Sequence, residues 1–165
     1  MFFKKKYIGI PENKILLETK HWIINHRLDT EYPGYLMLGS KESTFRVSDL
    51  CTESLRSMGI ILGAVENRMY ERLKPETVII SKLGFSKGFG CHFHLIPVYS
   101  WLYDSIKRDK SYSISEPDGL DFSLFISRKF CEGSEQFPKR ALNIEDAITL
   151  LDLQSLTQNL EVRNA

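Results

Sequence analysis

The sequence carries almost no excess charge of either sign. Its 165 residues include 22 lysines and arginines against 21 aspartates and glutamates, a formal net charge of +1. A dedicated nucleic-acid-binding protein usually shows a basic excess on one face, so nucleic acid is not expected as a partner. No apolar run approaches the roughly 18 residues of a membrane span, and the first residues lack the apolar core of a signal peptide. A membrane is therefore not expected as a partner either.

Cysteine is scarce. The three cysteines, at positions 51, 91 and 131, are odd in number and widely spaced, which is not the pattern of a disulfide framework. A reducing cytoplasm is therefore the predicted location. Hydrophobic residues at 42% and charged residues at 26% are ordinary for a globular protein, and the length predicts a single domain over residues 1–165.

Two common nucleotide-binding motifs are missing. The chain has a glycine-rich stretch at 84–90, but neither Gly-Lys-Ser nor Gly-Lys-Thr ends it, and a strand pattern rather than a helix pattern follows. A phosphate-loop NTPase and a Rossmann dinucleotide-binding fold are therefore excluded. A Cys/His hydrolase is disfavoured as well, because the strand pattern points Cys91 towards the apolar side.

The most informative segment, at 88–97, reads Gly-Phe-Gly-Cys-His-Phe-His-Leu-Ile-Pro. It holds two of the four histidines, and a strand period of two places His92 and His94 on one face with Gly90 and Ile96. The other face is apolar. Glycines ahead of the histidines let backbone N–H groups approach a ligand and form an anion-binding nest. Two imidazoles beside such a nest indicate a phosphate site rather than buried core histidines.

The order of the predicted elements favours an α+β fold with an antiparallel sheet over a doubly wound fold, because strands and helices do not alternate strictly. Strand-like runs lie at 15–19, 21–26, 35–39, 78–83 and 90–97. The turn between the last two is too short for a crossover, so these two strands are predicted to be antiparallel neighbours.

One long helix is predicted between Thr52, as the N-cap, and Pro75, which stops it. Its apolar stripe, at alternating spacings of three and four, comprises Leu55, Met58, Leu62, Val65, Met69 and Leu73. The remainder predicts a short helix from Ser100, a strand at 120–126 and a final helix capped by Asn143.

The paired histidines could bind a metal or attack phosphorus. Zinc needs three or four protein ligands, and nothing in the sequence brings His21 or His26 near His92 and His94. No metal site and no cofactor are therefore predicted. A neutral imidazole is a good nucleophile towards phosphorus, and the labile phosphoramidate it forms divides one difficult displacement into two easier ones.

The histidine strand resembles a known family. Residues 92–97, His-Phe-His-Leu-Ile-Pro, resemble the second half of the histidine triad (HIT) motif, and residues 33–38, Pro-Gly-Tyr-Leu-Met-Leu, resemble the Pro-Gly-His-Leu-Leu-Val strand of that family. With the long helix in the expected place, the likeness covers a core of about residues 15–100. Residues 101–165 resemble the C-terminal extension of a bacterial HIT-like branch.

The resemblance implies a five-stranded antiparallel sheet with one long central helix, usually in a homodimer. It implies a nucleotide substrate: a dinucleoside polyphosphate, as for diadenosine tetraphosphate hydrolases, a nucleoside phosphoramidate or a nucleotide sugar. His92 falls on the nucleophile, which becomes transiently nucleotidylated, and His94 falls on the histidine that contacts the phosphate. The chain is thus predicted to be a nucleotide hydrolase or nucleotidyl transferase.

The chain also departs from the family pattern. Gly90 stands at the first histidine of the triad, Tyr35 replaces a further active-site histidine, and the acidic residue that holds the ribose falls near Arg27. Other groups are then predicted to bind the nucleotide and its phosphates: Asn25, His26, Arg27, Ser86, Gly88 and Gly90. The alternative is a catalytically weakened protein that binds nucleotides without turnover.

Overall fold

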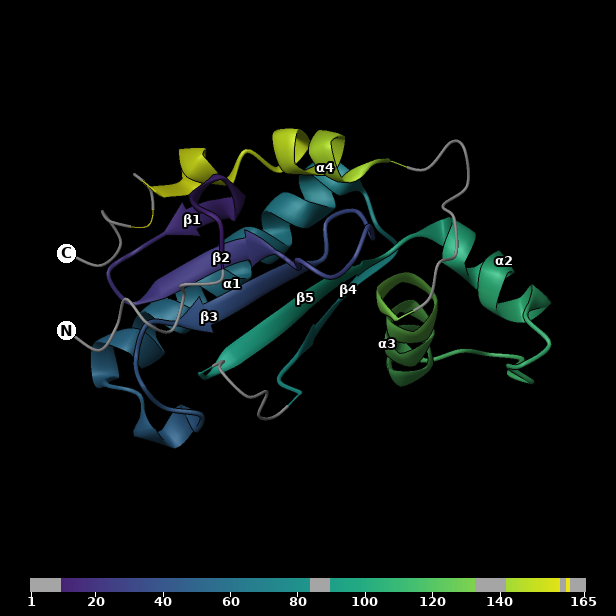
Figure 1. The fold of residues 1–165 in the computed structure, drawn as a ribbon, viewed down its shortest axis with the longest axis horizontal. Helices are drawn as coiled ribbons and strands as arrows, with labels where there is room; N and C mark the ends of the chain where they lie inside the picture. Colours follow the sequence, from purple (N-terminus) through teal and green to yellow (C-terminus); the bar gives the residue numbers. More distant parts are fainter. Residues whose placement is uncertain (1–9, 84–89, 133–141, 158–159, 161–165) are drawn as a thin grey trace.

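Five strands pair into one antiparallel sheet in the order β1-β2-β3-β5-β4 (Figure 1). The structure, a computed structural model, describes residues 10–83, 90–132, 142–157 and 160. The strands are β1 (Ile15–Glu18), β2 (Trp22–His26), β3 (Leu36–Ser40), β4 (Thr77–Ser81) and β5 (His92–Val98). β5 lies between β3 and β4 and is antiparallel to both. The predicted α+β class and the predicted pairing of the last two strands are confirmed.

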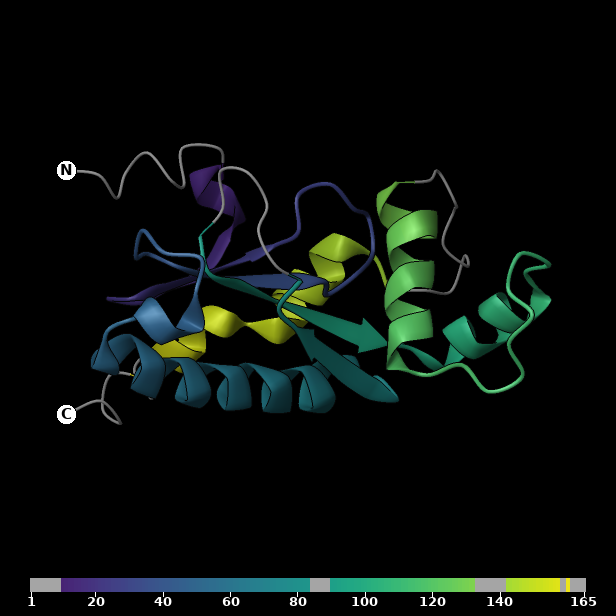
Figure 2. The ribbon, with the colours of Figure 1, turned by 90° about the horizontal axis from the view of Figure 1, so that it is seen from below.

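The long helix α1 (Thr52–Leu73) runs along one face of the sheet (Figure 2). Its second half buries the residues of the predicted stripe, but its first half buries Ser54, Ser57 and Ile61, and Leu55 is exposed. The two short serine side chains let the start of the helix approach the sheet closely. There the Ser54 carbonyl accepts a hydrogen bond from Trp22 Nε1 at 3.1 Å.

The ends of α1 are set by local backbone chemistry. The prediction of Thr52 as N-cap is wrong by one residue, because Cys51 has the extended backbone and its sulfur accepts from Ser54 N at 3.4 Å. At the other end Lys74 adopts a left-handed conformation with φ of 51°, and Pro75 cannot continue a helix. Among the described residues, no helix is both long and apolar enough to cross a membrane.

Three further helices follow the sheet: α2 (Ser100–Arg108), α3 (Gly119–Ile126) and α4 (Ile144–Leu151). α2 and α4 begin where the sequence predicts, and Asn143 caps α4 by accepting from Asp146 N at 2.8 Å. α4 packs against α1.

The predicted strand at 120–126 is wrong, because this segment is the helix α3. Asp118 and Asp121 form a capping box at its start, and the buried residues Phe122, Phe125 and Ile126 follow helical spacing. A short apolar run does not distinguish a strand from a buried helix by periodicity alone. The capping pattern is the signal that decides between them.

We expect Asp118→Ala to lower the free energy of unfolding by about 1 kcal/mol, the usual cost of losing an N-cap side chain. The carboxylate accepts from Leu120 N at 2.8 Å and Asp121 N at 3.0 Å. Urea unfolding followed by circular dichroism measures the loss. Asp104→Ala is the control, since Asp104 is exposed and pairs with the exposed Arg108, and it should cost under about 0.5 kcal/mol. Equal losses would contradict the capping role.

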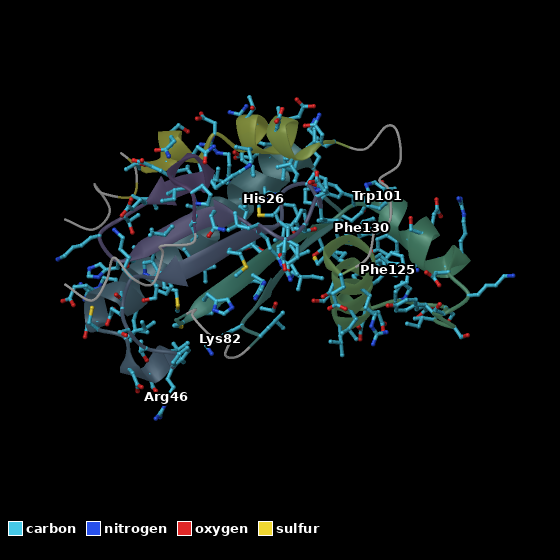
Figure 3. All side chains as sticks on the ribbon, viewed as in Figure 1. His26, Arg46, Lys82, Trp101, Phe125 and Phe130 are labelled. Carbon is cyan, nitrogen blue, oxygen red and sulfur yellow. The ribbon has the colours of Figure 1, made fainter. Side chains whose placement is uncertain are left out.

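An aromatic cluster joins the second half of the chain to the sheet (Figure 3). Phe130, in the turn that extends α3, lies with its ring centroid 5.5 Å from that of Tyr32 and 5.8 Å from that of Trp101. Its carbonyl accepts from Thr30 Oγ1 at 2.7 Å, and Tyr32 Oη donates to the Pro97 carbonyl at 2.6 Å. The connection between β2 and β3 is thereby held from both sides.

Candidate active site

A cleft of about 290 Å³ opens on the face of the sheet away from α1. The register places Met37 of β3 opposite both Asn25 of β2 and His94 of β5, so these side chains share one face. Phe93 points to the other face, where its ring lies 6.2 Å from that of Trp22. The lining side chains used below are Asn25, Arg27, Asp29, Met37, His92 and His94. The predicted alternation around His92 is therefore confirmed.

The Gly90 carbonyl fixes the orientation of His92. His92 Nδ1 lies 2.8 Å from this oxygen, and a carbonyl can only accept a hydrogen bond. Nδ1 therefore carries the proton, and the lone pair of the neutral ring is on Nε2. The ring is 4% exposed and borders the cleft. This is the tautomer that a nucleophilic Nε2 requires.

His94 is held in the opposite tautomer by Tyr35. Tyr35 Oη accepts from Arg27 Nη1 at 2.9 Å and lies 3.0 Å from His94 Nδ1. A hydroxyl that accepts from the guanidinium directs its own proton to Nδ1, so the His94 proton resides on Nε2. The His92 and His94 ring centroids are 5.1 Å apart. The cleft thus combines an imidazole with an Nε2 lone pair and an imidazole with an Nε2–H donor.

Asp29 anchors the guanidinium of Arg27. Arg27 Nε and Nη2 lie 2.5 Å and 3.0 Å from the two carboxylate oxygens of Asp29, a bidentate pair that fixes the plane of the guanidinium. Arg27 also lies over the Tyr35 ring, with Cζ 4.9 Å from the centroid. Hydrogen bonding from Arg27 lowers the pKa of Asp29. Asp29, Arg27, Tyr35 and His94 form one connected chain.

Burial, the neighbouring His92 and the charge of Arg27 lower the pKa of His94 to about 4, with Asp29 opposing. The ring is therefore neutral at pH 7. A neutral ring with a fixed Nε2–H can donate a hydrogen bond to an anionic oxygen without itself carrying a charge.

The lowered pKa of His94 makes its contribution to stability depend on pH. Between the unfolded value of 6.5 and the folded value of about 4, the unfolded chain binds more protons, so the free energy of unfolding falls as the pH falls through this window. We expect urea unfolding at about pH 7 and pH 4.5 to show a smaller loss in His94→Gln than in the wild type. Equal losses of unfolding free energy in the two proteins would contradict the lowered pKa of His94.

The structure places only some of the other predicted nucleotide-binding residues in the lining of the cleft. Asn25 and Arg27 line the cleft, whereas Gly90 is not among its lining residues and its carbonyl accepts from His92 Nδ1. His26 lies outside the cleft lining: its Nδ1 and Nε2 lie 2.9 Å and 3.0 Å from the Arg27 and Tyr32 carbonyls. Its ring therefore holds the backbone after β2, and we do not assign it to phosphate binding. Ser86 and Gly88 lie outside the described residues.

Comparison with known proteins identifies the fold. A hypothetical histidine triad nucleotide-binding protein from Sulfolobus tokodaii matches at 13% identity with a TM-score of 0.53, over 98% of this chain and 93% of that one. A histidine triad protein from Marinobacter aquaeolei also matches at 13% identity with a TM-score of 0.53, over 92% and 97% of the two chains. No protein-family model and no curated protein sequence matches.

Proposed function

The chain has the histidine triad fold, and from that premise we propose that it is a nucleotidyl hydrolase or transferase with His92 as its nucleophile. In the first step His92 Nε2 forms a bond to the α-phosphorus of a nucleotide while the bond from phosphorus to the leaving group breaks. In the second step water attacks the same phosphorus, the N–P bond breaks, and a nucleoside monophosphate and a proton are released. A second acceptor in place of water makes the reaction a transfer.

The hydrogen bond between His92 Nδ1 and the Gly90 carbonyl carries this proposal. The first histidine of the family motif is absent at position 90, but the group that orients His92 is a main-chain oxygen, which glycine supplies as well as histidine does. The lone pair therefore remains on Nε2, where it can attack. The nucleophile can therefore keep the required tautomer although glycine replaces the first histidine of the triad.

His94 is suited to stabilise the charge that develops on the phosphoryl oxygens. Its Nε2–H is a preorganised donor, and such donors contribute most in a site that excludes water. Arg27 adds a positive charge to the lining of the cleft. Asp29 neutralises part of this charge and holds the guanidinium in place.

The described cleft residues favour a leaving group that departs as a stable anion. His94 is neutral with a pKa of about 4, and the pKa of Asp29 is lowered, so that neither has an acidic proton to give at pH 7. A polyphosphate departs without protonation, whereas an amine needs a proton. We therefore propose a phosphoanhydride such as a dinucleoside polyphosphate as the substrate, ahead of a phosphoramidate.

Incubation with diadenosine tetraphosphate, followed by rapid quenching and peptide mass spectrometry, tests the mechanism. We expect an adenylyl adduct on His92 and release of adenosine monophosphate. Hydrolysis without any adduct on His92 would end the covalent mechanism.

The second candidate is a nucleotide-binding protein without turnover, which the glycine at position 90 and the tyrosine at position 35 favour. Saturating nucleoside monophosphate would then raise the melting temperature through RT ln(1 + [L]/Kd), with no hydrolysis of a phosphoanhydride. The implied homodimer stays a prediction that sedimentation can test.

A further inference from the structure

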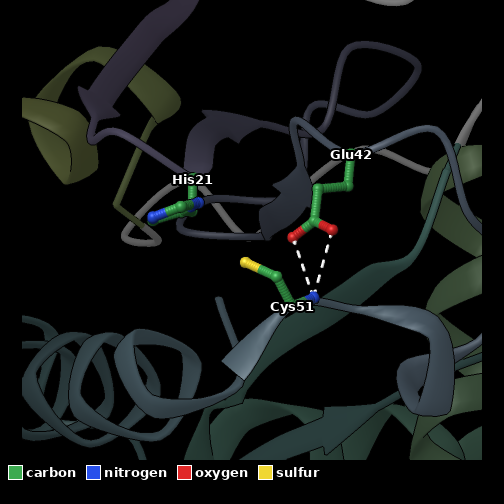
Figure 4. A group of neighbouring side chains, drawn as sticks. All are labelled: His21, Glu42 and Cys51. Carbon is green, nitrogen blue, oxygen red and sulfur yellow. Dashed lines mark hydrogen bonds between the residues drawn. The ribbon is translucent and has the colours of Figure 1, made fainter. Parts of the chain in front are cut away.

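Three metal-ligating side chains converge at a second place on the molecule (Figure 4). His21 lies in the turn between β1 and β2, Glu42 lies just after β3, and Cys51 is the N-cap of α1. One ligand atom from each lies within 4.8 Å of the others. Among the described residues, none of the three lines the His92 cleft. We propose that His21, Glu42 and Cys51 bind a zinc ion.

The spacing of the three atoms suits a single ion. Three atoms no more than 4.8 Å apart have a common centre within about 2.8 Å of each. Zinc bonds to nitrogen, oxygen and sulfur ligands are about 2.0–2.3 Å long. Side-chain movements of under about 1 Å therefore bring all three to bonding distance, with the strands and the helix left in place.

The donor set selects zinc among the common ions. Imidazole nitrogen, carboxylate oxygen and thiolate sulfur are the ligand types of zinc, whereas magnesium and calcium prefer oxygen alone. Three protein ligands leave a fourth tetrahedral position for water or one more side chain. Glu53 is suited to it, because it lies two residues after Cys51 and borders a cleft of about 240 Å³ together with His21.

Surrounding hydrogen bonds already orient two of the ligands, as outer-shell groups do in established metal sites. The Glu42 carboxylate accepts from Cys51 N, at 3.1 Å to Oε2, and from Ser54 Oγ. Ser54 N donates to Cys51 Sγ at 3.4 Å. Among the described residues, the ring nitrogens of His21 have no hydrogen-bond partner, so the imidazole is uncommitted.

Binding would release one proton, because zinc takes the thiolate of Cys51 and the thiol proton passes to solvent. The ion would join three segments that are distant in sequence. One of these segments supports the start of β5: Ser40 N donates to the Cys91 carbonyl at 2.8 Å, and Cys91 N donates to the Thr44 carbonyl at 2.5 Å. A metal at Glu42 would therefore stabilise the backbone next to His92.

Titration of chelator-treated full-length protein with zinc, by calorimetry, tests the site, and cobalt(II) provides a spectroscopic probe. We expect one equivalent of zinc to bind and raise the melting temperature, and cobalt to give a sulfur-to-metal charge-transfer band. Cys51→Ser keeps an N-cap side chain, so it should fold but lose the band and bind zinc about 100-fold more weakly or worse. His21→Gln should weaken zinc binding to the same extent.

Cys131→Ser is the matched control, since Cys131 is also half-buried but lies in the turn after α3. This variant should keep both the band and the affinity. The proposal is overturned if the wild type binds no zinc at micromolar concentration, or if the band persists in Cys51→Ser. It is equally overturned if binding survives in Cys51→Ser and is lost in His92→Asn, which would place the metal in the other cleft.

Discussion

His92→Asn should reduce turnover of a dinucleoside polyphosphate by about 10⁴-fold or more, the usual consequence of removing a nucleophile. Asparagine retains an N–H that can donate to the Gly90 carbonyl, which accepts from Nδ1 at 2.8 Å in the wild type. It has no equivalent of the Nε2 lone pair. The variant should therefore fold normally and form no covalent adduct. Single-turnover kinetics and mass spectrometry of the quenched reaction measure both effects.

Glu71→Ala, at an exposed position on α1, is the control for effects of mutagenesis and purification, and it should keep full turnover. Near-ultraviolet circular dichroism and the melting temperature check that His92→Asn is folded. Turnover within tenfold of the wild type in a folded His92→Asn protein is the result that the mechanism cannot accommodate.

Tyr35→Phe should lower kcat by about 10²–10³-fold, the range seen when one preorganised donor is removed. The hydroxyl links Arg27 Nη1 to His94 Nδ1, so without it the His94 proton is no longer confined to Nε2. A buried nitrogen also loses its partner, which costs about 1–3 kcal/mol of stability. Steady-state kinetics and urea unfolding measure the two losses separately.

Tyr99→Phe is the matched control for Tyr35→Phe. Tyr99 is also buried, and its hydroxyl donates to the Pro33 carbonyl at 2.9 Å, so its removal should cost similar stability but leave kcat unchanged. Tyr35→His restores a ring nitrogen in place of the hydroxyl and should recover part of the activity. If Tyr35→Phe and Tyr99→Phe lower kcat equally, Tyr35 acts through stability alone.

Much of the fold could be predicted because its strands and turns have strong local signals. The alternation around His92 fixed which side chains face the cleft, and the short glycine-rich connection fixed the neighbour of β5. The helical segment at 120–126 could not be predicted in the same way, because its apolar residues suit either period and only Asp118 with Asp121 favours a helix. The buried face of the first half of α1 was misassigned because Ser54 and Ser57 occupy it.

The candidate site was predicted only in part, because its hydrogen bonds depend on how three strands align. Arg27 was predicted from its place in the chain, but its bond to Tyr35 and the link onwards to His94 follow from the register of β2, β3 and β5. Nothing in the sequence indicated that the Asp29 carboxylate would form a bidentate ion pair with the Arg27 guanidinium. The hydrogen bond between His92 and the Gly90 carbonyl was not predicted, because every residue has a main-chain carbonyl and the residue type does not show which one will accept.

The hydrogen bond from Thr30 Oγ1 to the Phe130 carbonyl bears on where the chain can be truncated. In the sequence, Thr30 lies between Asp29 and Tyr35, two members of the chain of contacts that reaches His94. A version of the protein shortened after Val98 would contain every described cleft residue and would keep the hydrogen bond from Tyr32 to Pro97, but it would lose the one from Thr30 to Phe130. The part of the chain after Val98 thus supplies one of the contacts that hold the backbone beside the cleft.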